Sequence, residues 1–394
     1  MSINLAKERL RLRHEWDGSG ADLVLEVTPD QPATPASIAV SERLLRSYRA
    51  SVAQSSPMTS GSVWDGIAQH VQGDYLDLLD HGSPTEMADY LGRMYRTTAT
   101  HGTCQGAWEH GQIALDERYR RLKAAQFKSV LLAFVERSGA LPVENPEQSA
   151  WGSSMKIPLA QLMTHARRAL GVPFAPPAVD GGLYRLPTPK GGFHERDVYA
   201  AETAYALRSL TGDRPAFTIE IGGGVGKAAY WNVLSGGASA RLPGVPLPGG
   251  PAPKKPVHGI VDLPHILVLQ GFALAAAGAS FATAIEIEAG MEAEVLLVPP
   301  NKRDLLTAFR PEVFVNVDSL PEIPAAEARE YVRWMTTMGR SALLSINHET
   351  RPLVQAPNVR QNRVADLFAS ANARRTDRRL SWTRGGYVEE IYRW

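Results

Sequence analysis

Hydrophobic positions follow different spacings in the two halves of the chain. In the first half they recur three or four residues apart, for example at Val63, Ile67 and Val71, and again along 113–134 and 157–170. This spacing places apolar side chains on one face of a helix. The first half is therefore predicted to be mainly helical.

The second half alternates short apolar runs with longer helical segments. This alternation predicts a mostly parallel sheet with helices on both faces, and thus an α/β fold. A helix is predicted over 193–210, ahead of the first strand. The predicted strands cover 216–221, 257–261, 294–298, 312–317 and 341–346; the helices that follow cover 264–277, 302–309, 323–338 and 361–371; and a closing hairpin pairs 380–383 with 387–392 around a Gly-Gly turn.

Proline and glycine mark the expected domain boundaries. Residues 1–35 are charged and then proline-rich, and are expected to form an N-terminal arm. A mainly helical domain over 36–192 is expected to serve substrate binding or oligomerisation, and 193–394 forms the sheet domain. The Pro/Gly-rich connection 173–192 is either a wall of the active site or an interdomain linker. Residues 236–256 contain six prolines and five glycines, which exclude helix and central strand; this segment is a surface insertion or, alternatively, a lid.

A glycine-rich turn follows the first predicted strand. That strand ends at Glu220, and glycines stand at 222, 223, 224 and 226 before a helix begins at Lys227. Glycine permits positive φ and close approach of the backbone to a ligand, and a helix start offers unpaired N–H donors. The dinucleotide fingerprint G-x-G-x-x-G would require glycine at 227, where lysine stands. The E-x-G-x-G-x-G spacing instead resembles motif I of class I S-adenosylmethionine (SAM) methyltransferases; a turn without a ligand is the alternative.

Polar residues follow the other predicted strands. In an open α/β sheet, ligands bind at the carboxyl ends of the strands. Asp262 follows the second strand, where a carboxylate can accept both ribose hydroxyls, or it caps the helix after it. Asp318 and His348 follow the fourth and fifth strands, and Glu322 adds a second carboxylate. Methyl transfer to oxygen needs a base for the hydroxyl proton, which either type of side chain supplies. A helix cap for Asp318 and a surface turn for His348 are the alternatives.

Four segments in order resemble the sugar O-methyltransferase family. They are 220–226 (E-I-G-G-G-V-G), 261–264 (V-D-L-P), 314–322 (F-V-N-V-D-S-L-P-E) and 344–349 (L-S-I-N-H-E), within a resemblance that covers about residues 60–394. Val225 stands where the family often has an aromatic residue, Ile323 replaces its usual methionine, and the insertion 236–256 is unusual; these departures leave the substrate open.

The resemblance implies a Rossmann-like, class I methyltransferase fold with a seven-stranded sheet. It further implies methyl transfer from SAM to a hydroxyl of a sugar or glycoconjugate, with S-adenosylhomocysteine as the product. The residues expected to bind the cofactor are Glu220, Gly222, Gly223, Gly224, Gly226, Asp262, Leu263 and Asn316, and the candidate catalytic residues are Asp318, His348 and Glu322.

The composition and charge of the chain limit the kinds of binding partner and cellular compartment that we expect. With 42 basic and 41 acidic residues, the net charge of +1 gives no global attraction for nucleic acid or anionic membranes. The basic run 374–379 is expected to be a solvated helix end or turn. A single cysteine, Cys104, excludes an intramolecular disulfide and suits a reducing compartment. The N-terminus lacks an apolar signal segment and 266–284 is interrupted by glycine and Gln270, so we expect a cytoplasmic enzyme with no membrane span.

Several alternatives stay open. No dedicated metal site is expected, although Asp318 and Glu322 make Mg²⁺ a secondary candidate. Trp64, Trp108 and Trp151 could stack on sugar rings or form a core. The competing functions are an O-methyltransferase of a non-sugar natural product, an NAD-dependent oxidoreductase and a non-catalytic binding protein.

Overall fold

A computed structural model describes most of the chain. It covers residues 23–54, 63–145, 153–177, 181–188, 191–212, 216–236, 257–291, 293–349 and 361–394. Two predicted segments lie largely outside the described residues. They are residues 1–22 of the N-terminal arm and residues 237–256 of the Pro/Gly insertion 236–256.

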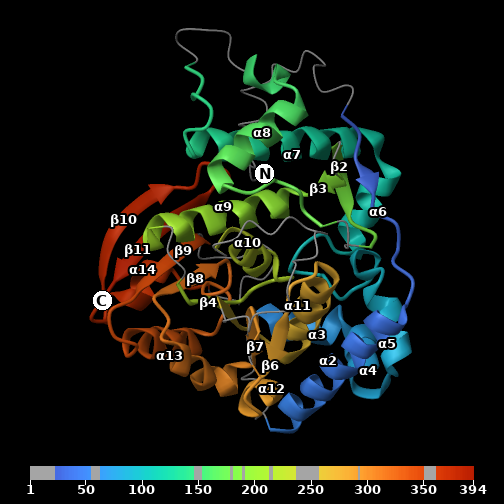
Figure 1. The fold of residues 1–394 in the computed structure, drawn as a ribbon, viewed down its shortest axis with the longest axis vertical. Helices are drawn as coiled ribbons and strands as arrows, with labels where there is room; N and C mark the ends of the chain where they lie inside the picture. Colours follow the sequence, from blue (N-terminus) through green and yellow to red (C-terminus); the bar gives the residue numbers. More distant parts are fainter. Residues whose placement is uncertain are drawn as a thin grey trace, which may run out of the picture.

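The main sheet has eight strands within the described residues, in the order β10-β11-β9-β8-β4-β5-β7-β6 (Figure 1). The six strands from β9 to β6 are parallel, and β11 runs antiparallel to both β9 and β10. From β4 the chain continues first to β5 on one side and later to β8 on the other, so the strand order reverses there. The strands are β4 (Thr218–Ile221), β5 (His258–Val261), β6 (Phe281–Thr283), β7 (Val295–Val298), β8 (Val313–Val317), β9 (Ala342–His348), β10 (Arg374–Leu380) and β11 (Tyr387–Arg393).

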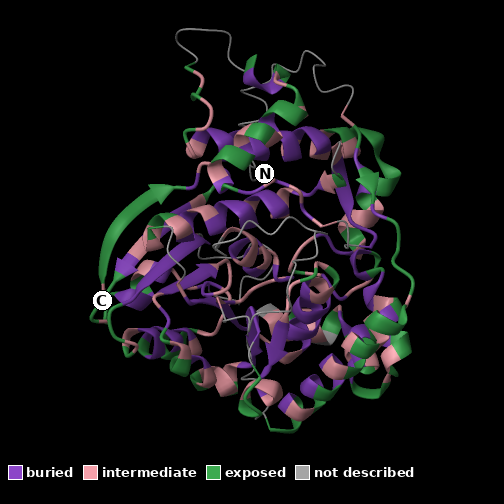
Figure 2. Cartoon of the chain, viewed as in Figure 1, coloured by how far each residue is buried: buried purple, intermediate pink, exposed green. Residues whose placement is uncertain are grey.

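Helices cover both faces of this sheet, which is why its strands are apolar on both sides. Val313 and Val315 pack with Leu207 of α9, whereas Phe314 between them packs on the opposite face with Trp334 of α13. Figure 2 shows the resulting buried sheet and its exposed edge strand, β10. One face carries α9 (Glu195–Thr211), α10 (Lys227–Gly236) and α11 (Pro264–Ala276); the other elements of this half are α12 (Ala284–Glu288), the 3₁₀ segment η3 (Pro300–Phe309), α13 (Ala325–Thr336) and α14 (Val364–Phe368). The predicted Rossmann-like α/β fold is confirmed, and β6 adds an edge strand to the seven predicted.

The N-terminal helices share a hydrophobic core with the sheet. Leu44 of α2 and Met87 of α5 belong to one buried cluster with Ile260 of β5. Gly271 of α11 permits a close contact with α2, because a Cβ there would lie 2.5 Å from Leu44 Cδ2. The division into three domains stays a prediction. The elements are α2 (Pro35–Ala53), α3 (Val63–His70), α4 (Gly73–His81), α5 (Pro84–Leu91), η1 (Met94–Arg96), α6 (Ala107–Leu115), α7 (Glu117–Arg137), η2 (Ser153–Lys156) and α8 (Leu159–Leu170).

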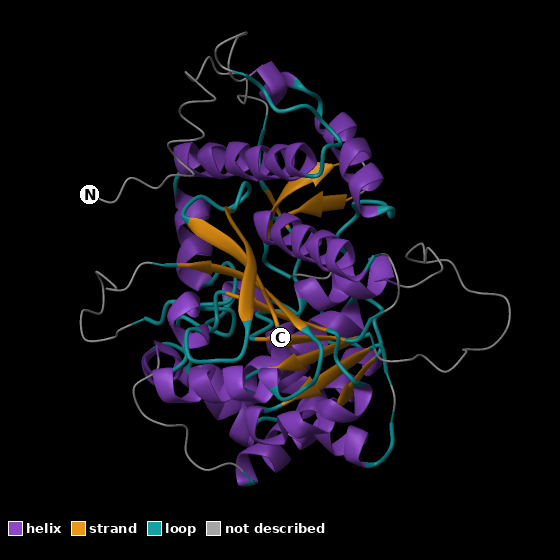
Figure 3. Ribbon diagram, turned by 90° about the vertical axis from the view of Figure 1, so that its left-hand side faces the viewer, coloured by secondary structure: helices purple, strands orange, loops and turns teal. Residues whose placement is uncertain are grey.

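The Pro/Gly-rich connection 173–192 contains regular structure that the sequence did not predict. A small sheet joins β1 (Glu26–Val27), β2 (Tyr184–Thr188) and β3 (Gly191–Phe193), seen beside α7 in the side view of Figure 3. The backbone N–H of Thr28 also donates to the Leu183 carbonyl at 2.8 Å. The described part of the N-terminal arm is therefore hydrogen-bonded to this connection.

The basic run 374–379 was wrongly expected to be a helix end or turn. It forms edge strand β10, so a closing hairpin is confirmed, but its first strand covers 374–380 and not the predicted 380–383. Ion pairs of Arg375 with Glu390 at 2.7 Å and of Arg378 with Glu349 at 2.8 Å compensate its charge. A charged edge strand resists pairing with other chains, and such a strand has no apolar alternation by which to recognise it.

Candidate functional site

A cavity of about 290 Å³ lies at the carboxyl ends of β4, β5, β8 and β9. This is the edge of the sheet where the strand order reverses and where a ligand is expected. Most of the residues predicted from the sequence line it, and these are Glu220, Gly222, Gly223, Gly224, Asp262, Asp318, Glu322 and His348. Gly226, Leu263 and Asn316 do not line it.

The glycine turn requires glycine for two different reasons. The φ angles of Gly222, Gly224 and Gly226 are 75°, 56° and 78°, in the left-handed region that costs other residues energy. A Cβ at position 222 would lie 2.3 Å from the Cβ of Ser319, whereas one at 224 would meet only the Thr103 carbonyl at 3.9 Å. The absence of a side chain at Gly222 therefore lets Ser319 pack against the turn, and its absence at Gly224 leaves open space in the cavity beside the backbone.

The Asp262 carboxylate holds the glycine turn from the neighbouring strand. It accepts hydrogen bonds from the N–H groups of Gly223 and Leu263, both at 2.8 Å, and from Gln270 Nε2 at 2.6 Å. Gln270 also donates to the Gly224 carbonyl at 3.2 Å. Burial raises the pKa of Asp262 to about 7 although these hydrogen bonds oppose the shift. The N-cap of α11 is Leu263 and shows no side-chain cap hydrogen bond, so Asp262 does not cap that helix.

Glu220 faces the cavity but already has a partner behind it. Its Oε2 lies 3.1 Å from His258 Nε2, and the other ring nitrogen of His258 lies 3.1 Å from Asn232 Nδ2. All three side chains are buried. If the Asn232 amide donates to Nδ1, then Nε2 carries the proton that His258 donates to Glu220, which keeps the carboxylate in place.

Asn316 does not face the cavity but holds together two of the turns that form it. Its side-chain amide donates to the Ile221 carbonyl at 2.8 Å and to Ser319 Oγ, and its Oδ1 accepts the Leu320 N–H at 3.3 Å. The residue is completely buried. These bonds tie the turn after β8 to the end of β4, and they occupy the polar atoms of Asn316.

Asp318 adopts a left-handed backbone, with φ of 69°, at the end of β8. Its Oδ2 accepts hydrogen bonds from Arg384 Nη2 at 2.5 Å and from the Tyr387 hydroxyl at 3.1 Å. Its Oδ1 is buried and has no hydrogen-bond partner among the described residues. One oxygen of Asp318 is therefore fixed, and the other is left without a hydrogen-bond partner among the described residues.

His348 and Glu322 complete the polar group at this end of the cavity. The His348 ring packs edge-on against Tyr387, with centroids 5.9 Å apart, and burial lowers the pKa of His348, so the imidazole is neutral at pH 7. Glu322 Oε2 accepts a hydrogen bond from Trp64 Nε1 of α3 at 3.0 Å. Burial, reinforced by the charge of Asp318, raises the pKa of Glu322 to about 7.

Helix α9, just ahead of the first strand of the main sheet, supplies a wall of the cavity, although the sequence singled out none of its residues for the site. Arg196, Tyr199, Ala200 and Thr203 line the cavity and lie three, four and seven residues apart, on one helix face. The helical spacing of Tyr199, Ala200 and Thr203 was visible in the sequence, but only the folded chain reveals that this face meets the strand ends.

Arg384 reaches the cavity from the turn between β10 and β11. Its guanidinium lies 3.8 Å from the ring centroid of Tyr387 and 4.9 Å from that of Tyr199. The sequence indicated only a Gly-containing hairpin turn at this position.

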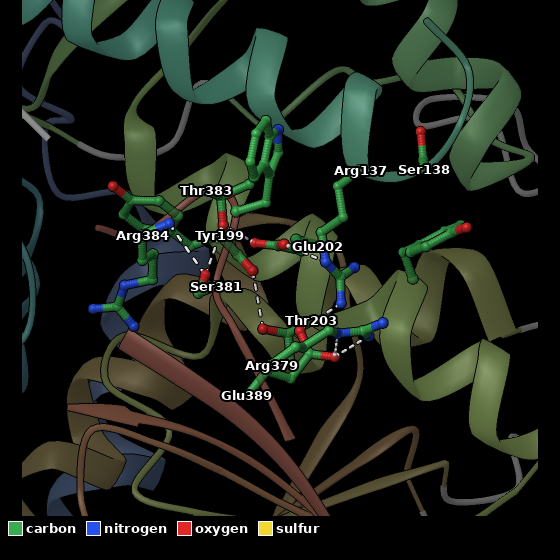
Figure 4. Close-up of polar contacts among 12 residues, drawn as sticks. Arg137, Ser138, Tyr199, Glu202, Thr203, Arg379, Ser381, Thr383, Arg384 and Glu389 are labelled. Atoms are coloured by element: carbon green, nitrogen blue, oxygen red, sulfur yellow. Dashed lines mark hydrogen bonds and ion pairs between the residues drawn. The ribbon is translucent and has the colours of Figure 1, made fainter. Parts of the chain in front are cut away.

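A buried ionic network stands behind this turn (Figure 4). Arg137 of α7 pairs with Glu202 of α9 at 2.9 Å and with Glu389 of β11 at 2.5 Å. Thr383 Oγ1 donates to Glu202, and Arg379 pairs with Glu389. The network ties α7, α9 and the hairpin together next to Arg384.

Neither a metal cluster nor a membrane helix is found in the part of the chain that the structure describes. No group of three or more His, Cys, Asp or Glu side chains there is arranged to hold a metal ion. Within those same ranges, no helix is both long and apolar enough to cross a bilayer.

Comparisons with known proteins return structural similarity only. No protein-family model matches the chain, and no curated protein matches it. Magnesium protoporphyrin IX methyltransferase from Synechocystis PCC 6803, with bound SAM, has a TM-score of 0.31 at 13% identity, over 50% of this chain and 82% of that one. The 1,6-didemethyltoxoflavin-N1-methyltransferase from Burkholderia thailandensis has a TM-score of 0.32 at 15% identity, over 50% and 81%. Mitomycin 7-O-methyltransferase has a TM-score of 0.31 at 15% identity, over 84% and 94%.

All three TM-scores lie below 0.5 and all identities below 25%. These similarities therefore carry no argument about the chain. Its fold is assigned from its own strand order, and the chemistry of its cavity is inferred from the geometry of its own side chains. Membership of the sugar O-methyltransferase family stays a prediction.

Proposed function

We propose that the protein is a SAM-dependent O-methyltransferase. The observation that carries the proposal is one cavity that joins two features: a glycine turn held by a strand-end carboxylate, and a group of proton acceptors at the adjacent strand ends. Gly224 supports the fit of the cofactor, because the backbone there faces open cavity space that a Cβ would begin to fill. Glu220, Gly222, Gly223, Gly224 and Asp262 would hold it.

SAM, when bound, supplies a methyl group on a sulfonium whose positive charge disappears on transfer. The carboxylates of Glu220, Asp318 and Glu322 line the cavity and favour a cation there. The unpartnered Oδ1 of Asp318 can accept the proton of the acceptor hydroxyl, while Arg384 and Tyr387 keep Oδ2 in place. Neutral His348 is a second proton acceptor beside Tyr387.

The acceptor is proposed to be a sugar or glycoconjugate. Its support is the resemblance of the four sequence segments, together with a cavity rich in hydroxyl-binding carboxylates and bordered by Trp64. A hydroxylated natural product other than a sugar fits the same cavity. A panel of sugars, glycoconjugates and phenols, assayed with radiolabelled SAM, separates the two substrate classes.

The cofactor assignment is tested by titration calorimetry. Wild-type protein is expected to bind SAM, and Asp262→Ala is expected to lose binding because Gly223 and Gln270 lose their acceptor. Unaltered SAM affinity in Asp262→Ala would refute the assignment, and NAD in the purified protein would favour an oxidoreductase.

The catalytic assignment requires methyl transfer to be measured. Asp318→Asn and His348→Ala are expected to retain SAM binding, while the variant that removes the base loses about 10²- to 10⁴-fold in rate. Asparagine is chosen because it tolerates the left-handed φ of position 318. Wild-type rates in both variants would remove these residues from the mechanism, and no transfer to any acceptor would favour a non-catalytic binding protein.

A further inference from the structure

Arg196 is a cation of the cavity wall that makes no direct ion pair with the described residues. It is the second residue of α9, and its backbone N–H donates to His194 Nδ1 at 3.1 Å. Its half-buried side chain lines the cavity. Among the described residues, none makes a hydrogen bond or ion pair with the Arg196 guanidinium.

The other two cations of the cavity are paired. Lys227 Nζ lies 2.8 Å from Asp197 Oδ1, and Arg384 Nη2 lies 2.5 Å from Asp318 Oδ2. The charges of Asp318 and Glu195 act on Arg196 without a direct ion pair. A guanidinium that is partly removed from water and makes no direct ion pair gains from an anion delivered by a ligand. Arg196 is thus positioned to bind a ligand anion.

The distribution of charge around the cavity indicates which anion this is. Carboxylates project from the strand ends at Glu220, Asp262, Asp318 and Glu322, whereas Arg196 projects from the helix. SAM carries two cationic groups, the sulfonium and the ammonium, and a single anionic group, the carboxylate of its methionyl part. The acidic side of the cavity suits the first two groups, and a planar guanidinium suits a carboxylate through two parallel hydrogen bonds.

We propose that Arg196 binds the methionyl carboxylate of the cofactor, so that SAM is recognised jointly by the sheet and by α9. This inference rests on the proposed function. It makes Arg196 a specificity residue that distinguishes complete cofactor from fragments that lack the carboxylate.

The test compares two ligands by titration calorimetry. S-adenosylhomocysteine carries the carboxylate, and S-adenosyl-3-thiopropylamine keeps the ammonium but lacks the carboxylate. Wild-type protein is expected to bind S-adenosylhomocysteine about 10- to 100-fold more tightly, the range expected for a charge-assisted hydrogen-bonded pair. Arg196→Gln is expected to remove this difference by weakening only S-adenosylhomocysteine.

Two further variants make the result specific. Arg196→Lys keeps the charge without the planar fork, and is expected to retain part of the preference; it also serves if Arg196→Gln fails to fold. Arg333→Gln is the matched control, because Arg333 is 74% exposed on α13 and does not line the cavity. It is expected to leave both affinities unchanged.

Three outcomes would overturn the inference: unchanged binding of S-adenosylhomocysteine by Arg196→Gln, equal weakening of both ligands, or no preference between the ligands in the wild-type protein. Failure of the wild-type protein to bind SAM or either ligand would instead refute the proposed function itself, so the two failures are distinguishable.

Discussion

At the residue scale, Gly222 and Gly224 share a positive φ but have different surroundings. Alanine at 222 would meet Ser319 Cβ at 2.3 Å in addition to the backbone cost, whereas alanine at 224 has open space. We expect Gly222→Ala to lower the free energy of unfolding by more than about 2 kcal/mol and Gly224→Ala by about 1 kcal/mol. Urea denaturation measures both losses.

The same pair separates stability from ligand binding. Gly224→Ala places a methyl group beside the cavity. We therefore expect this variant to lose more free energy of SAM binding than free energy of unfolding. A Gly224→Ala protein that binds SAM as tightly as wild type would place the cofactor away from this turn.

The pKa of Asp262 makes SAM binding depend on pH. Its carboxyl is neutral below about pH 7 and negative above it, and a cationic ligand favours the negative form. SAM affinity is therefore expected to rise with pH and to level off above about pH 7, at most tenfold per pH unit. Titration calorimetry from about pH 5.5 to 8.5 measures the curve.

Glu322 lines the same cavity and its pKa is also raised to about 7, so substitutions must separate the two carboxyls. If Asp262 is the group responsible, Asp262→Asn flattens the dependence while Glu322→Gln retains it. Retention of the full pH dependence in Asp262→Asn would contradict the prediction.

At the scale of elements, the position of Arg384 depends on contacts of residues that do not themselves line the cavity. The hairpin that carries it is fastened to α7 and α9 through Arg137, Glu202 and Glu389 (Figure 4). Burial raises the pKa of Glu202, which reflects the cost of holding that charge inside the protein. Ser381 Oγ also accepts the Arg384 N–H at 3.1 Å, which fixes the turn itself.

Removing the cation from this network is expected to be costly. Arg137→Met leaves Glu202 and Glu389 buried with fewer partners, and the free energy of unfolding is expected to fall by about 3 to 5 kcal/mol. Urea denaturation gives the value. Arg121→Met on the same helix, which breaks only the exposed pair with Glu117, should cost less than about 1 kcal/mol. Equal losses in the two variants would mean that the network adds nothing to stability.

The elements differ in how well the sequence predicts them. The buried parallel strands β4, β5, β7, β8 and β9 were predicted because each is a continuous apolar run bounded by glycine, proline or polar residues. The hairpin of β2 and β3 was missed because proline and glycine dominate it. The candidate residues at strand ends were predicted, since topology alone brings strand ends together. Arg196 and Arg384 were missed because a helix face and a distant turn meet the cavity only through tertiary packing.

At the scale of the whole molecule, the helices before residue 100 and the sheet share one core. Leu44, which is 2% exposed, packs in the cluster that also contains Ile260 and Phe281. Leu44→Ala is expected to cost about 2 to 5 kcal/mol and to shift a single calorimetric unfolding transition. Val52→Ala, at a position of the same helix that is 44% exposed, should change stability by less than about 0.5 kcal/mol. Two separate transitions, only one of which moves in Leu44→Ala, would show that the helices and the sheet unfold independently.

The cavity face of α9 also sets a length scale. Arg196 and Thr203 are seven residues apart, and a rise of 1.5 Å per residue separates them by about 10 Å along the helix axis. A compact molecule can touch only one end of this face, whereas an elongated one can touch both. The length of this helix face therefore selects ligands by their length. In a series of adenosine derivatives with progressively longer 5′ chains, the affinity should increase in one step when the chain becomes long enough to contact both Arg196 and Thr203.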